Sequence, residues 1–259
     1  MLEDVQNQKD TRQIEIDQVG ITDLEYPIIV EDKYNDFQST IAKIQMSVNL
    51  PHHYRGTHMS RFIEILNRFR GHLSLENIYS LLDEMEKIFD AQRSFFKAEF
   101  PYFIEKTAPV SGLKSLMNYR GIFIGEKYKN GEPCFKLGAK VAITTLCPCS
   151  KEISDYGAHN QRSIVTIYIK YKELVWLEDL ITLVEEQASC EIFPLLKRPD
   201  EKFVTEKAYD NPRFVEDIVR SVAKKLKDDS NITWFEIESK HFESIHNHNV
   251  YAIVKSHNI

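Results

Sequence analysis

Apolar and polar positions in the first half of the chain predict strands followed by helices. Residues 37–50 favour a strand, because the apolar side chains of Ile41, Ile44, Met46 and Val48 fall largely on one side of an extended chain. Residues 23–32 form a shorter strand candidate, and Pro51 should end the longer one. The chain therefore opens with extended segments.

Helices are predicted where apolar residues recur every three or four positions. Residues 59–69 show that spacing, and Gly71 should stop the helix. The stretch 74–100 opens with Ser74 as a helix N-cap, and its apolar positions keep a helical period up to Phe89. A hairpin over residues 112–147, with an Asn-Gly turn, should follow.

The second half repeats this order without visible sequence identity. Residues 162–172 alternate as a strand, and 177–189 read as a helix. A second helix, 211–226, begins with Asn-Pro, an N-cap followed by proline at the first helical position. Residues 233–244 and 247–257 read as two strands joined by a polar turn.

The repeated order predicts an α+β fold of two tandem modules. Each module would hold an antiparallel sheet with a helix pair on one face. We expect a flexible lead-in over residues 1–14, a first module over 15–146 and a second over 147–259, together forming one fused domain.

Composition narrows the class of protein. With 259 residues, 42% hydrophobic and 28% charged, the chain has enough apolar material for a globular core. A net charge of −6 argues against a nucleic-acid or anionic-membrane surface but not against a small anionic substrate. Four cysteines are too few for a disulfide framework, and neither a signal peptide nor a membrane-spanning run is visible. We expect a cytoplasmic protein with reduced thiols.

The segment LCPCSKEISDYGAHNQRS (146–163) carries the first candidate chemistry. Cys147 and Cys149 follow a predicted strand, with Pro148 between them and His159 ten residues after the second. A disulfide between the two is disfavoured, because side chains this close in an extended chain point to opposite faces. Metal ligation, a nucleophilic thiol and ordinary packing all remain open at this point.

Two further segments could supply ligands. HFESIHNH (241–248) gathers His241, Glu243, His246 and His248 between two strands, and an acidic loop before the 211–226 helix contains Glu201. A polar turn and a solvated acidic face are the plainer interpretations. Together with a cysteine and a histidine, however, such side chains could hold a zinc-like or manganese-like ion and leave one position open for water.

Other charged positions could bind a nucleotide. Glu216 lies in the first turns of the 211–226 helix, where a carboxylate could accept two hydrogen bonds from guanine or simply complement the helix dipole. His58 and Arg61 lie in a basic segment before the first helix, and Lys202 lies in the acidic loop. All three could hold phosphate, although a basic loop alone decides nothing.

Three blocks of this sequence resemble one known family. They are LCPCSKEISDYGAHNQRS (146–163), KRPDEKFVTEKAYDNPRFVEDIVR (197–220) and GTHMSRF (56–62). In this order they are similar to the prokaryotic type IB GTP cyclohydrolases, and the similarity covers essentially the whole chain. The resemblance implies a tunnelling fold and a homotetramer with active sites at subunit interfaces. From the charge and the lack of a membrane-spanning run we expect no nucleic-acid or membrane partner.

The resemblance also implies a reaction and a set of roles. GTP and water would become formate and 7,8-dihydroneopterin triphosphate, the entry to folate and to deazaguanine tRNA modification. It implies a divalent metal ion (zinc, manganese or iron), an essential thiol at Cys149, proton transfer by His159 or Cys149, and a guanine anchor at Glu216. The metal ligands it implies are Cys147, His159, Glu201 and His246, with Glu243 as a less certain member.

Two other functions remain as alternatives. A tunnelling-fold reductase could use Cys149 as a nucleophile toward a nitrile, but its usual nicotinamide signature is not visible. A non-catalytic binding module could hold a purely structural metal, whose coordination would be closed rather than open to water.

Overall fold

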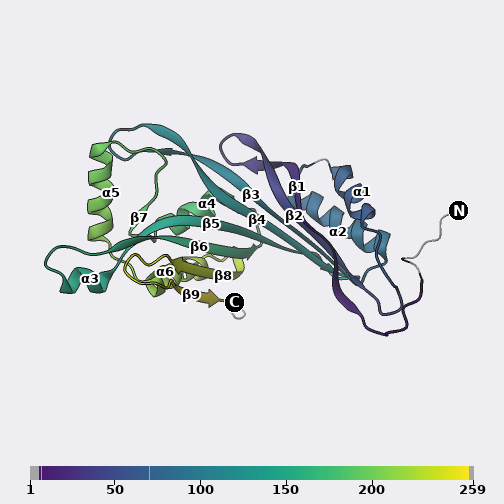
Figure 1. Ribbon diagram of the computed structural model, residues 1–259. Helices are drawn as coiled ribbons and strands as arrows, with labels where there is room; N and C mark the ends of the chain where they lie inside the picture. Colours follow the sequence, from purple (N-terminus) through teal and green to yellow (C-terminus); the bar gives the residue numbers. More distant parts are fainter. Residues whose placement is uncertain (1–5, 7, 70, 257–259) are drawn as a thin grey trace. The chain divides into compact units, whose positions relative to one another are not determined.

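Strands dominate the computed structural model, which describes residues 6, 8–69 and 71–256 (Figure 1). Part of the lead-in expected over residues 1–14 lies outside the described residues. The strands join in the order β1-β2-β3-β4-β5-β6-β8-β9, with β7 pairing with β5. The strands are β1 (Ile16–Asp32), β2 (Asp36–Leu50), β3 (Arg93–Thr107), β4 (Lys114–Tyr128), β5 (Cys134–Leu146), β6 (Asn160–Tyr171), β7 (Cys190–Glu191), β8 (Ile232–His241) and β9 (Val250–Lys255). The helices are α1 (Ser60–Phe69), α2 (Leu75–Phe89), α3 (Pro148–Ile153), α4 (Leu177–Glu185), α5 (Arg198–Asp210) and α6 (Val215–Asp228).

The chain divides into two compact units. The first comprises Met1–Pro101 and Ile122–Lys136, and the second Tyr102–Gly121 and Leu137–Ile259. Strands β3 and β4 each contribute to both units, so the units interleave along the sequence. The expected modules at 15–146 and 147–259 stay a prediction.

In the first unit, α1 and α2 pack against each other, and α2 packs on β2. As expected, β2 ends just before Pro51, and α2 starts after Ser74, whose hydroxyl accepts a hydrogen bond from the Asn77 amide at 3.2 Å. Gly71 follows α1 with φ +81°, and a Cβ there would lie 2.5 Å from the Pro27 carbonyl oxygen. A glycine is therefore required at this turn.

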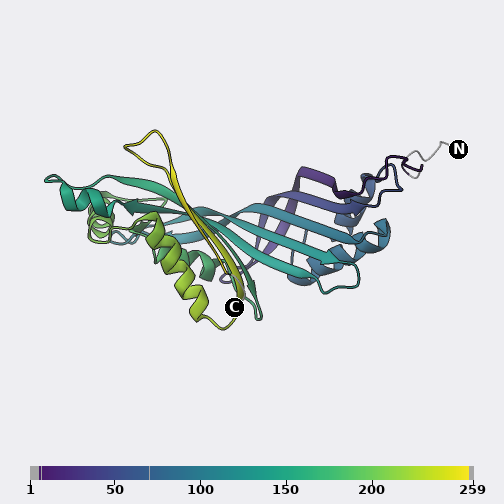
Figure 2. The same ribbon diagram turned by 90° about the horizontal axis from the view of Figure 1, so that it is seen from below.

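In the second unit, β6 pairs with β5 and β8, and α6 packs on β8 and β9 (Figure 2). The helix predicted over 211–226 begins later, at Val215, with Phe214 and not Asn211 as its N-cap. Of the apolar residues at helical spacing, Ile218, Val222 and Leu226 are buried, whereas Phe214 is 44% exposed. Helix α4 packs against α6. This apolar layer supports the strand ends that carry the candidate site.

Two segments differ from the sequence-based expectation. The stretch 74–100 is not one helix: α2 ends at Asp90, which adopts a left-handed conformation, and residues from Arg93 onward begin β3. The acidic segment before α6, expected as a loop, forms helix α5 instead. The extended parts and the helices otherwise confirm an α+β fold.

Candidate active site

The two cysteines lie where β5 ends and the short helix α3 begins. Cys147 is the N-cap of α3, and its sulfur accepts a hydrogen bond from the Ser150 amide at 3.4 Å. Pro148 occupies the first turn, where its missing N–H costs nothing. Cys149 is exposed. The two thiols therefore have different surroundings, one tied to the backbone and one open to solvent.

His159 lies directly beside Cys147. Its carbonyl accepts a hydrogen bond from the Cys147 amide at 3.1 Å, and its own amide donates to the Ser150 hydroxyl at 3.2 Å. The His159 Nδ1 atom lies 3.1 Å from the Gln161 Oε1 atom, which can only accept a hydrogen bond. Nδ1 therefore carries the proton, and Nε2 keeps the lone pair that a metal ion or a proton needs.

The segment after β8 also reaches this histidine. The Phe242 amide donates to the Arg162 carbonyl at 3.0 Å, and the Ser244 hydroxyl lies 3.5 Å from His159 Nδ1. Glu243 lies between Phe242 and Ser244 and is half-buried. His246 is exposed, and its ring stacks on His248 with centroids 5.1 Å apart. The structure therefore brings Cys147, His159 and the Glu243 segment to one edge of the sheet.

The start of α6 lies beside the same edge. The Arg213 amide donates to the Leu146 carbonyl at 3.0 Å, one residue before Cys147. Asp217 caps the helix by accepting a hydrogen bond from the Phe214 amide at 2.9 Å. Glu216, in the first turn, is exposed. A carboxylate is therefore presented next to the strand end that carries the cysteines.

Among the buried polar side chains behind this edge, His241 was a candidate from the sequence, whereas Thr145, Gln161 and Ser163 were missed. Gln161 donates to the Thr145 hydroxyl at 2.9 Å, and Thr145 lies 2.7 Å from the Ser163 hydroxyl and 3.4 Å from His241 Nδ1. Burial lowers the pKa of His241 to about 4, while the nearby Glu216 charge acts in the opposite direction. His241 is thus a neutral imidazole at physiological pH. The sequence did contain one signal for this cluster: polar residues stand at strand positions where the alternating pattern expects apolar ones.

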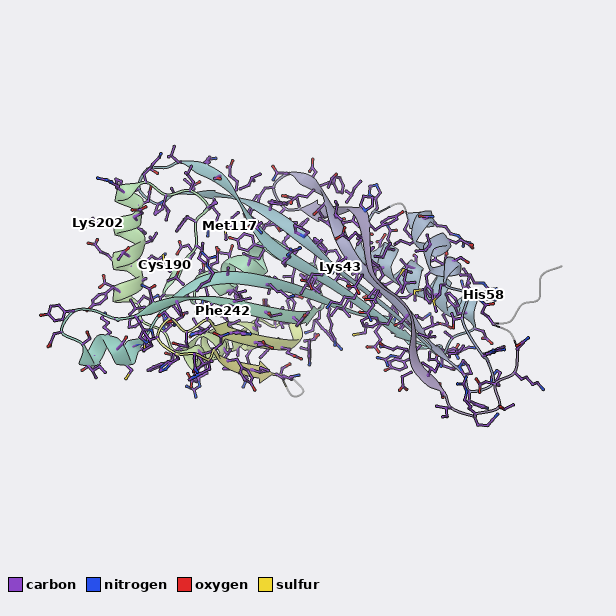
Figure 3. All side chains as sticks on the ribbon, viewed as in Figure 1. Lys43, His58, Met117, Cys190, Lys202 and Phe242 are labelled. Carbon is purple, nitrogen blue, oxygen red and sulfur yellow. The ribbon has the colours of Figure 1, made fainter. Side chains whose placement is uncertain are left out.

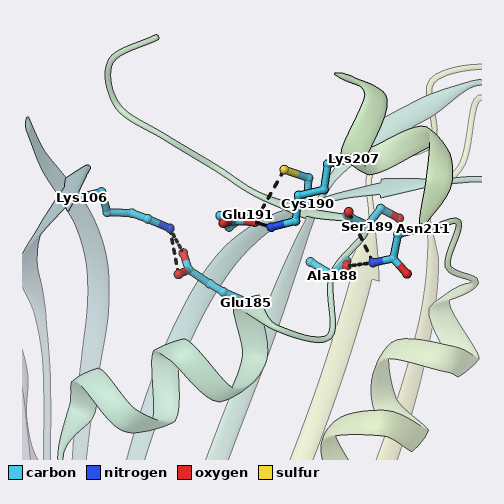
Figure 4. Close-up of polar contacts among 8 residues, drawn as sticks. All are labelled: Lys106, Glu185, Ala188, Ser189, Cys190, Glu191, Lys207 and Asn211. Carbon is cyan, nitrogen blue, oxygen red and sulfur yellow. Dashed lines mark hydrogen bonds and ion pairs between the residues drawn. The ribbon is translucent and has the colours of Figure 1, made fainter. Parts of the chain in front are cut away.

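A network of charged side chains braces the segment between α4 and α5 (Figure 4). Lys207 forms an ion pair with Glu191 at 2.6 Å. Burial alone would raise the pKa of Glu191, but the hydrogen bond and charge of Lys207 hold this pKa below its usual range. Burial, together with the Glu191 charge, raises the pKa of the Cys190 thiol to about 12. Cys190 is therefore an inert structural thiol, in contrast to the exposed Cys149.

The same segment supports the end of β5. The Leu146 amide donates to the Ser189 hydroxyl at 3.0 Å, and the Asn211 side chain donates to the Ala188 carbonyl at 2.7 Å. A cavity of about 790 Å³ opens between this segment, α5 and the start of β6, with Asn160 and Arg162 in its lining. The edge that carries the cysteines thus adjoins a cavity large enough for a small-molecule ligand.

Helix α5 carries two of the predicted site residues. Asp200 fixes its first turn by accepting hydrogen bonds from the Val110 and Ser111 amides, both at 2.8 Å. Glu201 and Lys202 are exposed at this end, and Figure 3 shows Lys202 there. Tyr209, whose carbonyl contacts Lys151 of α3, lies about 12 Å further along the helix at 1.5 Å per residue. Within one chain, Glu201 therefore does not lie next to Cys147.

The remaining predicted residues belong to the first unit. His58 is half-buried just before α1, and Arg61 lies in its first turn. The Arg61 guanidinium donates to the Ile88 carbonyl of α2 at 3.4 Å. Neither position by itself reveals a phosphate site.

Cys147 and His159 suit a divalent ion, because a thiolate and an imidazole lone pair are ligands of zinc and of similar borderline ions. Within the described part of the chain, no three His, Cys, Asp or Glu side chains lie close enough together to hold a metal. The two adjacent donors therefore fit a metal ion, while the complete ligand set stays a prediction. Among the described residues, none of the helices is long and apolar enough to cross a membrane.

Solved structures with a similar fold include urate oxidases. The uricase from Arthrobacter globiformis has a TM-score of 0.51 at 9% identity and covers 93% of this chain and 92% of that chain. A hyperthermostable urate oxidase mutant of Bacillus sp. TB-90 has a TM-score of 0.54 at 10% identity and covers 93% and 98%. At such low identity the likeness concerns the fold alone, and it confirms the tunnelling fold.

Sequence comparison gives the family. Residues 2–252 match the family described as type I GTP cyclohydrolase folE2. GTP cyclohydrolase FolE2 of Geobacter sp. (strain M21) is 53% identical over 254 residues, covering 98% of this chain and 94% of that protein. The protein of the same name from Syntrophotalea carbinolica is 54% identical over 254 residues, covering 98% and 95%. The chain therefore belongs to the type I GTP cyclohydrolases of the folE2 kind.

Proposed function

We propose that this GTP cyclohydrolase, an enzyme of folate biosynthesis, converts GTP and water to formate and 7,8-dihydroneopterin triphosphate at the edge formed by Cys147, Cys149, His159 and Glu216. The observation that carries this assignment is the pairing of Cys147 and His159 through a backbone hydrogen bond of 3.1 Å, with the exposed Cys149 two residues away. The relatives favour neither the nitrile reductase nor the purely structural metal module.

The reaction requires water to add to C8 of guanine, the imidazole ring to open and formate to leave. A divalent ion held by Cys147 and His159 would supply the Lewis acidity that makes water a nucleophile near neutral pH. Glu216 is exposed at the start of α6 and accepts hydrogen bonds from the N1–H and exocyclic amine of guanine. Held this way, the base presents C8 at its far end.

Proton transfer falls to two groups of the chain. Cys149 is exposed, and no hydrogen bond of its thiol is found among the described residues, so this thiol can pass a proton to a ring nitrogen as the imidazole opens. The Nε2 atom of His159 keeps a lone pair because Gln161 fixes the proton on Nδ1. The ribose then opens, rearranges and recloses on the freed amine, which depends on precise holding of both ends.

His58, Arg61 and Lys202 are the proposed contacts of the triphosphate. Lys202 forms an exposed ion pair with Glu206 at 2.6 Å, which a phosphate could replace at little cost. Substitution of a phosphate contact should raise KM more than it lowers kcat, because it removes binding shared by the ground and transition states.

The test incubates zinc-loaded or manganese-loaded protein with GTP and measures formate and the oxidised, fluorescent pterin. Cys149→Ala should abolish both products while metal content stays normal, and Cys147→Ala should lower metal content. Cys134→Ala is the matched control, because Cys134 is also a free, partly accessible cysteine outside the proposed site. Normal turnover by both Cys147→Ala and Cys149→Ala would refute the residue assignment.

A cytoplasmic homotetramer with active sites at subunit interfaces is part of the proposal. It is supported by the exposed positions of Glu201 and His246, which leave both carboxylate and imidazole available to another subunit. Light scattering should give a mass of four chains. Mixing inactive Cys149→Ala and Glu201→Gln subunits should restore part of the activity, and a monomeric, fully active enzyme would refute the arrangement. The product would also feed deazaguanine tRNA modification.

A further inference from the structure

The proposed reaction leaves the cavity of about 790 Å³ beside the cysteine edge unused. Its walls are the end of β5, the start of β6, the loop 155–158, the segment 190–193 and one face of α5. All of these elements belong to the second unit. A volume of this size is far larger than a bound water needs and suits part of a small molecule. The chemistry of the walls indicates which part.

Arg162 is the one basic side chain among the described residues that line this cavity. In the strand register it lies opposite Thr144 of β5, which lines the cavity too. Arg162 is exposed, and no ion pair or hydrogen bond of its guanidinium is found within the described ranges. A guanidinium presents its N–H groups in a planar fork that matches two oxygens of a phosphate group. Arg162 therefore offers the cavity an anion-binding group that the fold does not use.

Neutral donors stand beside this arginine. Asn160, the first residue of β6, lines the cavity and is exposed. Gly157 and Ala158 line it from the loop, and in the described part of the chain no hydrogen bond of either backbone amide is found. Gly157 has φ +119° and open space on the side where a Cβ would lie, so a ligand can approach the loop backbone. Successive backbone amides in a turn form concavities that bind anions.

Two carboxylates also line the cavity, and neither is placed to exclude an anion. Glu191 is already paired with Lys207 at 2.6 Å. Asp155 is exposed, where water and salt screen its charge. The charge that remains for a ligand near the start of β6 is therefore the positive charge of Arg162.

The cavity lies at a suitable distance from the proposed chemistry. His159 immediately precedes β6, and three residues of extended chain, about 10 Å, separate it from Arg162. With C8 of guanine beside Cys147 and His159, the ribose and the first phosphate occupy most of that length. On the opposite wall, Thr205 of α5 lies one helical turn after Lys202, which is already a proposed phosphate contact.

We propose that this cavity holds the outer phosphates of GTP, with the Arg162 guanidinium, the Asn160 side-chain amide and the backbone amides of Gly157 and Ala158 as donors. This inference rests on the proposed function, because it places C8 of guanine at Cys147 and His159. Arg162 is here a substrate-binding residue and takes no part in proton transfer. It distinguishes nucleotides by the number of their phosphates.

The test compares the Kd values of GTP and GMP, measured by calorimetry on the metal-loaded protein. Both are measured in a Cys149→Ala background, in which the proposed function predicts binding without turnover. GMP keeps the base, the ribose and the inner phosphate but lacks the outer phosphates. The background protein should bind GTP at least about tenfold more tightly than GMP, because charge-assisted hydrogen bonds to the outer phosphates are lost. A ratio near one would overturn the proposal.

Arg162→Met keeps the length of the side chain and removes the charge. It should weaken GTP at least about tenfold and leave GMP within about twofold, whereas Arg162→Lys should fall between the two proteins. Arg68→Met is the matched control, because Arg68 is an exposed arginine of the first unit paired with Glu84, and it should change neither Kd. Equal weakening of GTP and GMP by Arg162→Met would mean a merely structural arginine and overturn the proposal. An unchanged ratio would do the same.

Two further measurements keep the result decisive. If Arg162→Met does not fold, Asn160→Asp, which adds a negative charge to the cavity wall, must lower the preference for GTP over GMP by at least about threefold. An unchanged preference there also overturns the proposal. Formate release from GTP by the wild type is measured in parallel. A preference that depends on Arg162 without formate release refutes the proposed reaction and keeps the phosphate site, whereas formate release with a preference independent of Arg162 refutes the phosphate site alone.

Discussion

The ion pair between Lys106 of β3 and Glu185, the last residue of α4, gives the sharpest test of what stabilises the second unit. The Lys106 ammonium lies 2.8 Å from both Glu185 oxygens, and the Tyr119 hydroxyl donates to one of them at 2.7 Å. A carboxylate at the C-terminal end of a helix is unfavourable by itself, so Glu185 depends on these partners. Glu185→Leu would leave an ammonium and a hydroxyl without their acceptor.

The expected loss of stability follows from the burial of the Lys106–Glu185 ion pair. The two side chains are only 12% and 13% exposed, so most of the pair is removed from water. Breaking a fully buried pair by removing one partner costs about 3–5 kcal/mol, and the small exposed part lets water reach the stranded ammonium. We therefore expect Glu185→Leu to lower the free energy of unfolding by about 2–4 kcal/mol. The double variant Lys106→Met/Glu185→Leu should recover to within about 1.5 kcal/mol of wild type, because no charge is stranded.

Urea unfolding followed by circular dichroism, at one fixed protein concentration, measures these changes as shifts in midpoint at constant m. Lys224→Met is the matched control, because Lys224 and Asp228 form an exposed pair whose loss should cost less than about 0.5 kcal/mol. A Glu185→Leu effect as small as this control would refute the reasoning. So would a double variant less stable than Glu185→Leu alone.

Three other outcomes are expected. Iodoacetamide at pH 8 should alkylate the exposed Cys149 first, and it should alkylate last the buried Cys190, whose pKa is raised to about 12. If mass spectrometry showed Cys190 reacting as fast as Cys149, the assigned environments would be wrong. Gln161→Leu should weaken metal binding about 10–100-fold in a chelator competition, because His159 Nδ1 loses its acceptor, whereas Gln187→Leu, just after α4, should not. Hydrogen bonds from Ser111 and from backbone amides hold the pKa of Asp200 below its usual range despite burial. The ionised Asp200 carboxylate therefore stabilises the folded state above about pH 4, and this stabilisation is lost as the pH falls through the lower pKa of the folded state. Asp200→Asn should flatten that acid limb of the stability profile, and an unchanged limb in acid titration would contradict this role.

Elements with a strong local pattern were predictable from the sequence. Pro51 ends β2 as expected, and the apolar stripe of α6 is buried from Ile218 onward, as its spacing indicates. Helix α5 was missed because its sequence has no apolar face: only Asp200 and Ala208 are buried along it. The start of β3 was missed because α2 ends at Asp90 without glycine or proline, so nothing marked the change of period.

The site was predictable only where its residues are neighbours in sequence. Cys147 and His159 lie together because one short segment folds back on itself. Thr145, Ser163 and His241 come from three strands, and their proximity depends on a register that no local pattern encodes. Glu216 joins them only because α6 packs on β8, which is a property of the folded unit.

Helix α5 is fastened at its ends rather than along its length. Asp200 binds the first turn to the Val110–Ser111 backbone, and the last turn is held through Tyr209 to Lys151. Its central outward positions, such as Phe203, therefore carry little of the fold. A fluorophore or cross-linker attached there would report on the helix without disturbing it, and natural variation between orthologues should accumulate there before it reaches either end.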